Sequence, residues 1–117
     1  MSVKLWFNPG CGTARNVRAW LNDQGIAYDL RDYLKDPPTR VEIEDVLKKG
    51  NMQAGDLLRA KEAQAEELGL RGSDDQHAIL DAMVAHPKLI NRPVVIDGER
   101  AKLCRPASEV ETFMAGR

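Results

Sequence analysis

Cysteine is scarce in this sequence: only Cys11 and Cys104 are present, and they lie far apart along the chain. A structural zinc site normally uses four ligands, mostly cysteine and histidine at close spacing. The two histidines, His77 and His86, complete no such cluster, so no metal site is predicted. A CxxC pair is also lacking, because the third residue after Cys11 is Ala14. Without a local dithiol, any thiol that resolves a disulfide of Cys11 must come from elsewhere.

The sequence also lacks an excess of charge and a long apolar run. Its 17 lysines and arginines against 18 aspartates and glutamates give a net charge of −1, so nothing favours nucleic acid or an anionic membrane as a partner. No segment approaches the roughly 18–20 apolar residues of a membrane span, and the N-terminal MSVKLWF is too short for a secretory signal. We therefore expect a cytoplasmic protein whose thiols stay reduced.

Hydrophobic patterning predicts strands and helices at both ends of the chain. Alternating apolar residues predict strands at 3–7, 26–34, 94–96 and 101–104. Apolar residues at helical spacing predict helices at 12–24 and 107–116. The last two strands are expected to form a hairpin through the turn signal Asp97–Gly98.

The middle of the chain is expected to be helical. Thr39 and Glu42 form a capping box, which predicts a helix that ends at Gly50. Residues 54–69 predict one or two short helices, with an interruption near residues 59–62.

A second capping box, Ser73 with Gln76, predicts one more helix that stops before Pro87. The complete order is strand–helix–strand, several helices, then two strands and a helix. This order predicts an α/β protein with a thioredoxin-like fold, in which a helical insertion at about residues 37–88 separates the two halves of a mixed four-stranded sheet. Residues 1–117 are expected to form a single domain, since no repeat or low-complexity tract divides them.

Cys11 falls in the turn NPGCGT, between the first predicted strand and the first predicted helix. Asn8-Pro9-Gly10 has a turn composition, and Gly12 would let the backbone pass close to whatever Cys11 binds. The N–H groups at the helix start, including that of Thr13, have no partners within the helix and favour an anion. We therefore predict a lowered pKa for the Cys11 thiol. The alternative is a thiol buried as a small apolar side chain, which is the interpretation we keep for Cys104.

Three arginines stand out by their positions. Arg92 and Arg105 each precede a proline, at the start of the third predicted strand and at the end of the fourth, and Arg59 ends the segment DLLR. In a thioredoxin-like fold, the segment before the third strand faces the turn that holds Cys11. Several guanidinium groups around a cysteine would form a site for a tetrahedral oxyanion, whereas ordinary surface ion pairs remain the alternative.

The segments NPGCGTARN, YLKDPPTR, LLR, HPKLINRPVVI and KLCRPASEV together resemble the glutaredoxin-dependent arsenate reductases over nearly the whole chain. The resemblance implies that Cys11 is the nucleophile and that three arginines bind the oxyanion: Arg59, Arg92 and Arg105. It places Pro93 at the position of the cis-proline of thioredoxin-like folds. Cys104 matches a cysteine of the family that is not considered catalytic.

The resemblance also implies a reaction and its partners. Cys11 would attack arsenate, glutathione would add as a co-substrate, and glutaredoxin would resolve the resulting mixed disulfide; no bound cofactor is expected. One residue departs from the family pattern, because Phe7 stands where well-studied members have a histidine that helps to ionise the thiol. Ionisation of Cys11 would then depend on the helix start and the arginines.

Two other functions are left open by the sequence. One is a glutathione-dependent thiol or disulfide reductase on the same fold, which Phe7 allows but which needs no set of three arginines. The other is a regulator that binds RNA polymerase, as the related Spx-type proteins do. Those proteins use a CxxC switch, and Ala14 removes the second thiol of that switch here.

Overall fold

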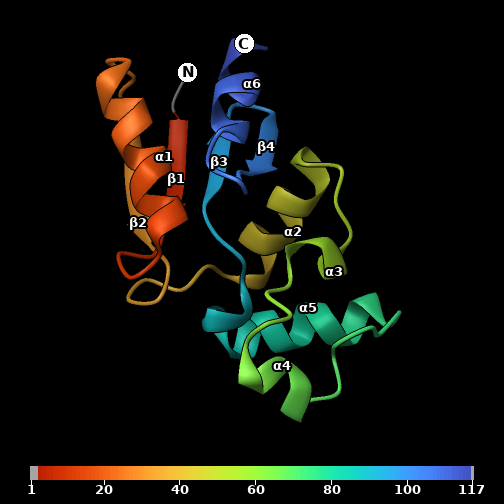
Figure 1. Ribbon diagram of the computed structural model, residues 1–117. Helices are drawn as coiled ribbons and strands as arrows, with labels where there is room; N and C mark the ends of the chain where they lie inside the picture. The colour runs from red at the N-terminus through yellow and green to blue at the C-terminus, as the bar shows by residue number, and fades with distance from the viewer. Residues whose placement is uncertain (1–2, 117) are drawn as a thin grey trace. The chain divides into compact units, whose positions relative to one another are not determined.

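The computed structural model describes residues 3–116 and divides into two compact units (Figure 1). The first, the sheet unit, combines the two ends of the chain, up to Asp36 and from Arg92 onward. It contains β1 (Val3–Phe7), α1 (Gly12–Asp23), β2 (Asp29–Asp32), β3 (Val94–Asp97), β4 (Arg100–Leu103) and α6 (Glu109–Ala115). The second, the helical unit Pro37–Asn91, contains α2 (Arg40–Lys49), α3 (Ala54–Leu57), α4 (Ala63–Glu67), α5 (Gln76–Ala85) and the 3-10 helix η1 (Pro87–Leu89).

The sheet has the strand order β2-β1-β3-β4. β1 is parallel to β2 and antiparallel to β3, and β3 is antiparallel to β4. The sheet is mixed and four-stranded, and the chain forms several helices after its first two strands and before its last two. This arrangement confirms the predicted thioredoxin-like α/β fold.

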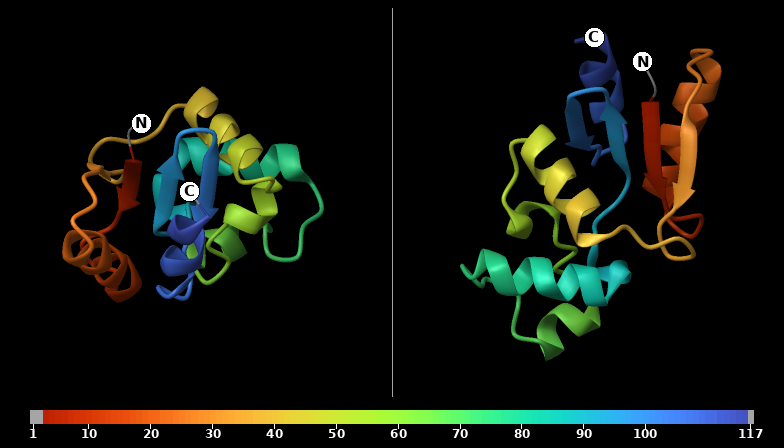
Figure 2. Two further views of the ribbon diagram at one scale, coloured as in Figure 1. Left: turned by 90° about the horizontal axis from the view of Figure 1, so that it is seen from above. Right: turned by 180° about the vertical axis from the view of Figure 1, so that it is seen from behind.

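One face of the sheet is covered by α1 and α6 (Figure 2). The alternation of β1 directs Val3, Leu5 and Phe7 to this face. The helices contribute an apolar stripe each, and the buried members of this cluster from the two helices are Ala14, Val17, Leu21, Val110, Phe113 and Met114. The apolar contacts fix the position of the first turn of α1 relative to the end of β1.

The second strand is shorter than predicted, four residues in place of residues 26–34. Ile26 donates its N–H to the carbonyl of Leu21 and so closes the end of α1, where Gly25 has a φ of 69°. After Asp32 the backbone turns, because the N–H groups of Lys35 and Asp36 both bond to the Asp32 carbonyl. Turn hydrogen bonds at both ends therefore limit the strand.

The β3–β4 hairpin is confirmed with its turn one residue later than predicted. Asp97 pairs with Arg100, so Gly98 and Glu99 form the connection and Gly98 takes the left-handed conformation at φ 61°. The C-terminal helix also begins later, at Glu109, since residues 106–108 form turns that lead into it.

In the helical unit, one predicted cap is confirmed and one is wrong. Thr39 and Glu42 make both hydrogen bonds of a capping box at the start of α2. At α5, however, Asp75 is the N-cap and its carboxylate accepts from the N–H of Ala78. Gln76 makes no capping bond to Ser73, because its side chain accepts a hydrogen bond from the N–H of Gly55. A contact distant in sequence therefore replaces the predicted local one.

The segments before and after α4 and α5 meet in the helical unit. Residues 54–67 form two short helices, with the interruption where it was predicted. Leu58 and Ile90 pair as an antiparallel bridge, and the N–H of Arg59 donates to the Leu89 carbonyl at 2.7 Å. None of the helices within residues 3–116 is both long enough and apolar enough to span a membrane.

Candidate active site

The turn between β1 and α1 holds Cys11 through backbone hydrogen bonds. The Asn8 side-chain oxygen accepts from the N–H of Gly10 at 2.8 Å, and the Asn8 carbonyl accepts from the N–H of Cys11 at 3.0 Å. Cys11 is the N-cap of α1 with an extended backbone, and its carbonyl accepts the first helical hydrogen bond, from Arg15. The Cys11 thiol therefore lies at the helix end toward which the N–H groups of the first helical turn point.

Gly12 has less influence on this geometry than its position suggests. Its backbone has no positive φ, and an added Cβ would meet only the Nη2 atom of Arg15, at an ordinary distance of 3.7 Å. The fold itself therefore does not require glycine at this position.

The open end of the β3–β4 hairpin positions Arg92 and Arg105. Val94 pairs with Leu103, and the N–H of Cys104 donates to the Pro93 carbonyl, so the residues just outside the two strands lie side by side. Both arginines precede cis-prolines, at Arg92–Pro93 and Arg105–Pro106.

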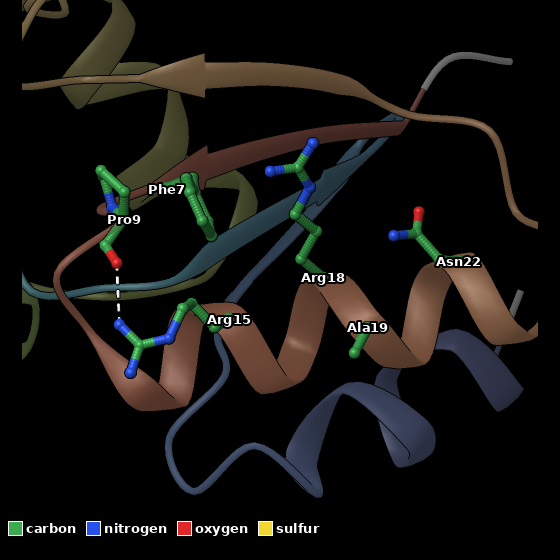
Figure 3. Close-up of a pocket in the computed structure, with 6 residues that line it drawn as sticks. All are labelled: Phe7, Pro9, Arg15, Arg18, Ala19 and Asn22. Carbon is green, nitrogen blue, oxygen red and sulfur yellow. Dashed lines mark hydrogen bonds between the residues drawn. The ribbon is translucent and has the colours of Figure 1, made fainter.

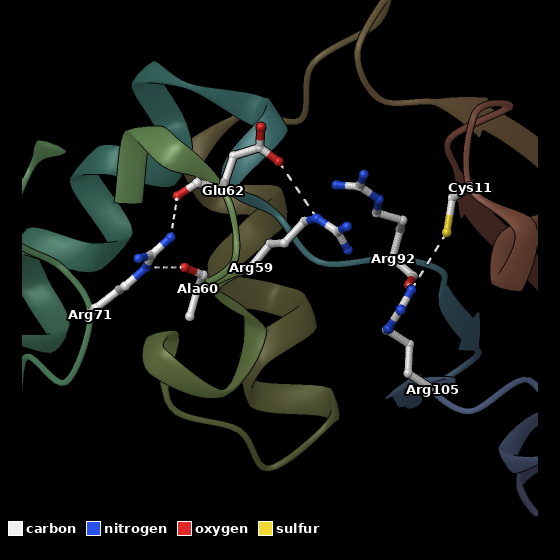
Figure 4. A network of polar contacts seen from close by, with 7 residues as sticks. All are labelled: Cys11, Arg59, Ala60, Glu62, Arg71, Arg92 and Arg105. Atoms are coloured by element: carbon white, nitrogen blue, oxygen red, sulfur yellow. Dashed lines mark hydrogen bonds and ion pairs between the residues drawn. The ribbon is translucent and has the colours of Figure 1, made fainter. Parts of the chain in front are cut away.

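Arg105 connects this hairpin to the thiol (Figure 4). Its Nη1 atom lies 3.5 Å from Cys11 Sγ and donates to the Arg92 carbonyl at 3.0 Å. The contact joins residues 94 positions apart in sequence, so it exists only because the sheet places β1 beside β3.

The surroundings of Cys11 favour its thiolate. Burial raises the pKa of the Cys11 thiol. The N–H groups of Ala14 and Thr13 and the guanidinium groups of Arg105 and Arg92 lower the pKa by a larger amount. The pKa of the thiol therefore lies below its ordinary value. The residue retains about 9% of its surface exposed to solvent. A partly accessible thiolate beside two guanidinium groups can attack an electrophile and hold the negative charge of that electrophile's oxygens.

Known proteins are similar to this chain over most of its length. The sequence profile of the ArsC family matches residues 6–113. An arsenate reductase from Rhizobium meliloti strain 1021 is 40% identical over 111 residues, covering 94% of this chain and 79% of that protein. An arsenate reductase from Neisseria meningitidis serogroup A is 33% identical over 114 residues, covering 96% and 97%.

The chain belongs to the ArsC family. The structure of an arsenate reductase from Vibrio cholerae, which is 34% identical in sequence, superposes with a TM-score of 0.89. The superposition covers 96% of this chain and 97% of that one. The resemblance inferred from the sequence motifs is thereby confirmed at the level of family and fold.

The second cysteine of this ArsC chain has the opposite environment. Cys104 is fully buried in the apolar cluster beneath α1 and α6. Burial raises the pKa of its thiol to about 12; in addition, Lys102 lowers the pKa and Glu109 raises it, each by a smaller amount. Cys104 is therefore a neutral, inaccessible thiol.

Tyr33 is a residue of this site that the sequence analysis did not single out. Its ring is fully buried, and burial raises the pKa of its phenol, while Arg92 and the Asn8 side chain lower it and the nearby Cys11 raises it. The phenol therefore lies among Cys11, Arg92 and Asn8. Its position in the family-like segment YLKDPPTR could have pointed to a role in the site. A single tyrosine in a predicted strand is, however, typical of a core position.

Arg59, the third predicted oxyanion ligand, belongs to the helical unit, and the structure describes its neighbours there. Its Nε atom lies 3.5 Å from a carboxylate oxygen of Glu62. Arg71 supports the same loop, because its guanidinium donates to the carbonyls of Ala60 and Glu62 (Figure 4). The same guanidinium pairs with the Glu66 carboxylate. A fixed loop therefore carries Arg59.

Within the part of the chain that the structure describes, no group of three or more histidine, cysteine, aspartate or glutamate side chains could hold a metal ion.

Proposed function

We propose that this protein reduces arsenate to arsenite through a covalent intermediate on Cys11. The contact that supports this function most directly is that of the Arg105 guanidinium with the Cys11 sulfur, at 3.5 Å. A guanidinium at this position favours the thiolate and is placed to bind an oxygen of the anion that the thiolate attacks. The ArsC relatives named above are themselves arsenate reductases.

In the first step, the Cys11 thiolate attacks arsenic(V). A sulfur–arsenic bond forms, and one arsenate oxygen takes up a proton and leaves as water. Arg92 and Arg105 bind the remaining oxygens and compensate the charge that builds up on them. The resemblance assigns Arg59 to the same oxyanion as a third guanidinium.

In the second step, glutathione supplies the electrons. Its thiolate forms a disulfide with the Cys11 sulfur, the sulfur–arsenic bond breaks, and its electron pair reduces arsenic(V) to arsenic(III). The thiolate of glutaredoxin then attacks the glutathione sulfur of this mixed disulfide and releases Cys11 as a thiolate. An external resolving thiol is needed because Cys104, the only other cysteine of the chain, is fully buried and its thiol stays neutral.

Phe7 occupies the position at which well-studied relatives have a histidine. Its ring is buried in the apolar cluster that includes Cys11, so it contributes no charge to the thiolate. Stabilisation of the anion is left to the N–H groups of Thr13 and Ala14 and to the two arginines.

The decisive assay measures arsenite formation from arsenate with glutathione and glutaredoxin. We expect Cys11→Ser to abolish turnover and Cys104→Ser to retain most of it; the substituted hydroxyl can take over the contact of Cys104 with the Lys102 carbonyl. Equal loss in both variants would contradict the assignment of an external resolving thiol. Reduction of model disulfides without any arsenite formation would support a glutathione-dependent disulfide reductase instead.

A further inference from the structure

A second feature of the sheet unit is a pocket beside the Cys11 turn, with a volume of about 430 Å³ (Figure 3). It lies between the end of β1 and one side of α1 and is lined by Phe7, Pro9, Arg15, Arg18, Ala19 and Asn22. The steps proposed for Cys11 above use none of these residues.

The pocket carries positive charge that the protein does not neutralise. Arg15 and Arg18 are both exposed, and neither forms an ion pair with a carboxylate within residues 3–116. The first turn of α1 contains no acidic residue. Two guanidinium groups without carboxylate partners favour a ligand with negative charge.

Local contacts hold both guanidinium groups in place. Arg15 donates from Nη1 to the Pro9 carbonyl at 2.8 Å. Arg18 donates from Nε to the Tyr28 hydroxyl at 3.1 Å, and its guanidinium carbon lies 5.4 Å from the centroid of the Phe7 ring. Each contact uses one of the five N–H donors of a guanidinium, so further donors can bind a ligand.

The pocket adjoins the turn that carries the proposed nucleophile. Pro9 lies two residues before Cys11, and the backbone N–H of Arg15 donates to the Cys11 carbonyl. The Arg15 guanidinium extends over Gly12, since its Nη2 atom lies 3.7 Å from the position of an added Cβ there. A ligand bound by Arg15 and Arg18 would therefore lie next to the turn, and a molecule of tripeptide size, about 10 Å long when extended, could reach toward the sulfur.

We propose that this pocket binds glutathione and directs its thiol toward Cys11, an inference that rests on the proposed function. Glutathione carries two carboxylates, one at each end, which match the two guanidinium groups. The apolar side chains of Phe7 and Ala19 face its hydrocarbon parts, and the Asn22 amide adds a polar group at the far end of the pocket. The pocket thus selects a small anionic thiol in preference to a neutral one.

The first test measures binding without any reaction. S-methylglutathione has no free thiol, so calorimetric titration of the full chain with it reports the pocket alone. We expect Arg18→Ala to raise the Kd about tenfold, as loss of one charged hydrogen-bonding group does. The control Arg40→Ala also removes one positive charge, but Arg40 pairs with Asp81 in the helical unit, and its Kd should equal that of the wild type. An unchanged Kd in Arg18→Ala would overturn the proposal.

A second ligand tests the role of the carboxylates. The diethyl ester of S-methylglutathione keeps the peptide but loses both negative charges, and we expect it to bind at least about tenfold more weakly. Equal binding of the ester and the acid would also overturn the proposal.

The kinetic test separates this pocket from the oxyanion site. In Arg18→Ala we expect a higher KM for glutathione with an unchanged KM for arsenate, and Arg18→Lys should recover part of the loss. An unchanged KM for glutathione would overturn the pocket assignment and leave arsenate reduction standing. If the wild type reduces no arsenate, the proposed function fails, and the titrations still decide whether the pocket binds glutathione.

Discussion

At the scale of single residues, the protein gives opposite properties to its two thiols. Burial disfavours the thiolate at both Cys11 and Cys104. At Cys11 the helix start and two guanidinium groups outweigh this effect, whereas at Cys104 no comparable donor does so. Reactivity is therefore decided by the groups around the sulfur and not by burial alone.

The pH dependence of Cys11 alkylation follows from its lowered pKa. The reactive species is the thiolate, so the midpoint of the alkylation rate should lie below the value of about 8.5 for a free cysteine. Replacing Arg105 by alanine removes a cation that favours the anion, and the midpoint should therefore move to higher pH. Alkylation with iodoacetamide across a pH series measures both values, and Arg40→Ala serves as the matched control. A midpoint in Arg105→Ala equal to that of the wild type would contradict the role of this guanidinium.

Tyr33→Phe tests whether the buried phenol helps to position Arg92. The substitution keeps the ring in the core and removes only the hydroxyl, which interacts with Arg92 and Asn8. A hydrogen bond to a charged group contributes about 1.5–3 kcal/mol, so the Kd for sulfate, a tetrahedral anion that cannot react, should rise about tenfold. If the melting temperature without sulfate falls and the sulfate Kd stays constant, Tyr33 has only a structural role.

At the scale of elements, the sequence predicted what depends on local pattern. Alternation predicted β1 as residues 3–7, the Thr39 capping box predicted the start of α2, and both were confirmed. The predicted cap at Ser73 and the predicted length of β2 were wrong. Hydrogen bonds that cannot be inferred from the hydrophobic pattern determine where α5 begins and where β2 ends. The family motifs were enough to single out Arg92 and Arg105 as candidate ligands. The place of Tyr33 beside Cys11 could not be predicted, because it depends on packing between segments that are distant in sequence.

The corrected start of α5 makes a specific prediction about stability. Asp75 accepts the capping hydrogen bond of Ala78, whereas Ser73 accepts from the N–H of Asp75, outside the helix. Asp75→Ala should lower the free energy of unfolding by about 1 kcal/mol, a typical loss for an N-cap. The matched variant Ser73→Ala should cost clearly less in the same urea titration. The reverse order would restore the capping box predicted from the sequence.

At the scale of the whole molecule, the chain builds its sheet unit from both ends and its helical unit from the middle. Cys11, Tyr33, Arg92 and Arg105 all belong to the sheet unit. The thiolate and two of the three proposed oxyanion ligands therefore depend on the pairing of β1 with β3, which joins the N-terminal and C-terminal segments. Arg59 is the one proposed ligand that the helical unit supplies.

Sulfate binding tests this contribution of the helical unit. If Arg59 binds the same oxyanion as Arg92 and Arg105, Arg59→Ala should raise the sulfate Kd about tenfold or more, as expected for a lost charge-assisted hydrogen bond. Lys61→Ala is the matched control, because Lys61 is an exposed cation on the same loop and should leave the Kd unchanged. A ligand that binds only the folded state raises the melting temperature, so thermal unfolding with and without sulfate gives an independent measurement. Wild-type affinity in Arg59→Ala would restrict the oxyanion site to the two arginines of the sheet unit.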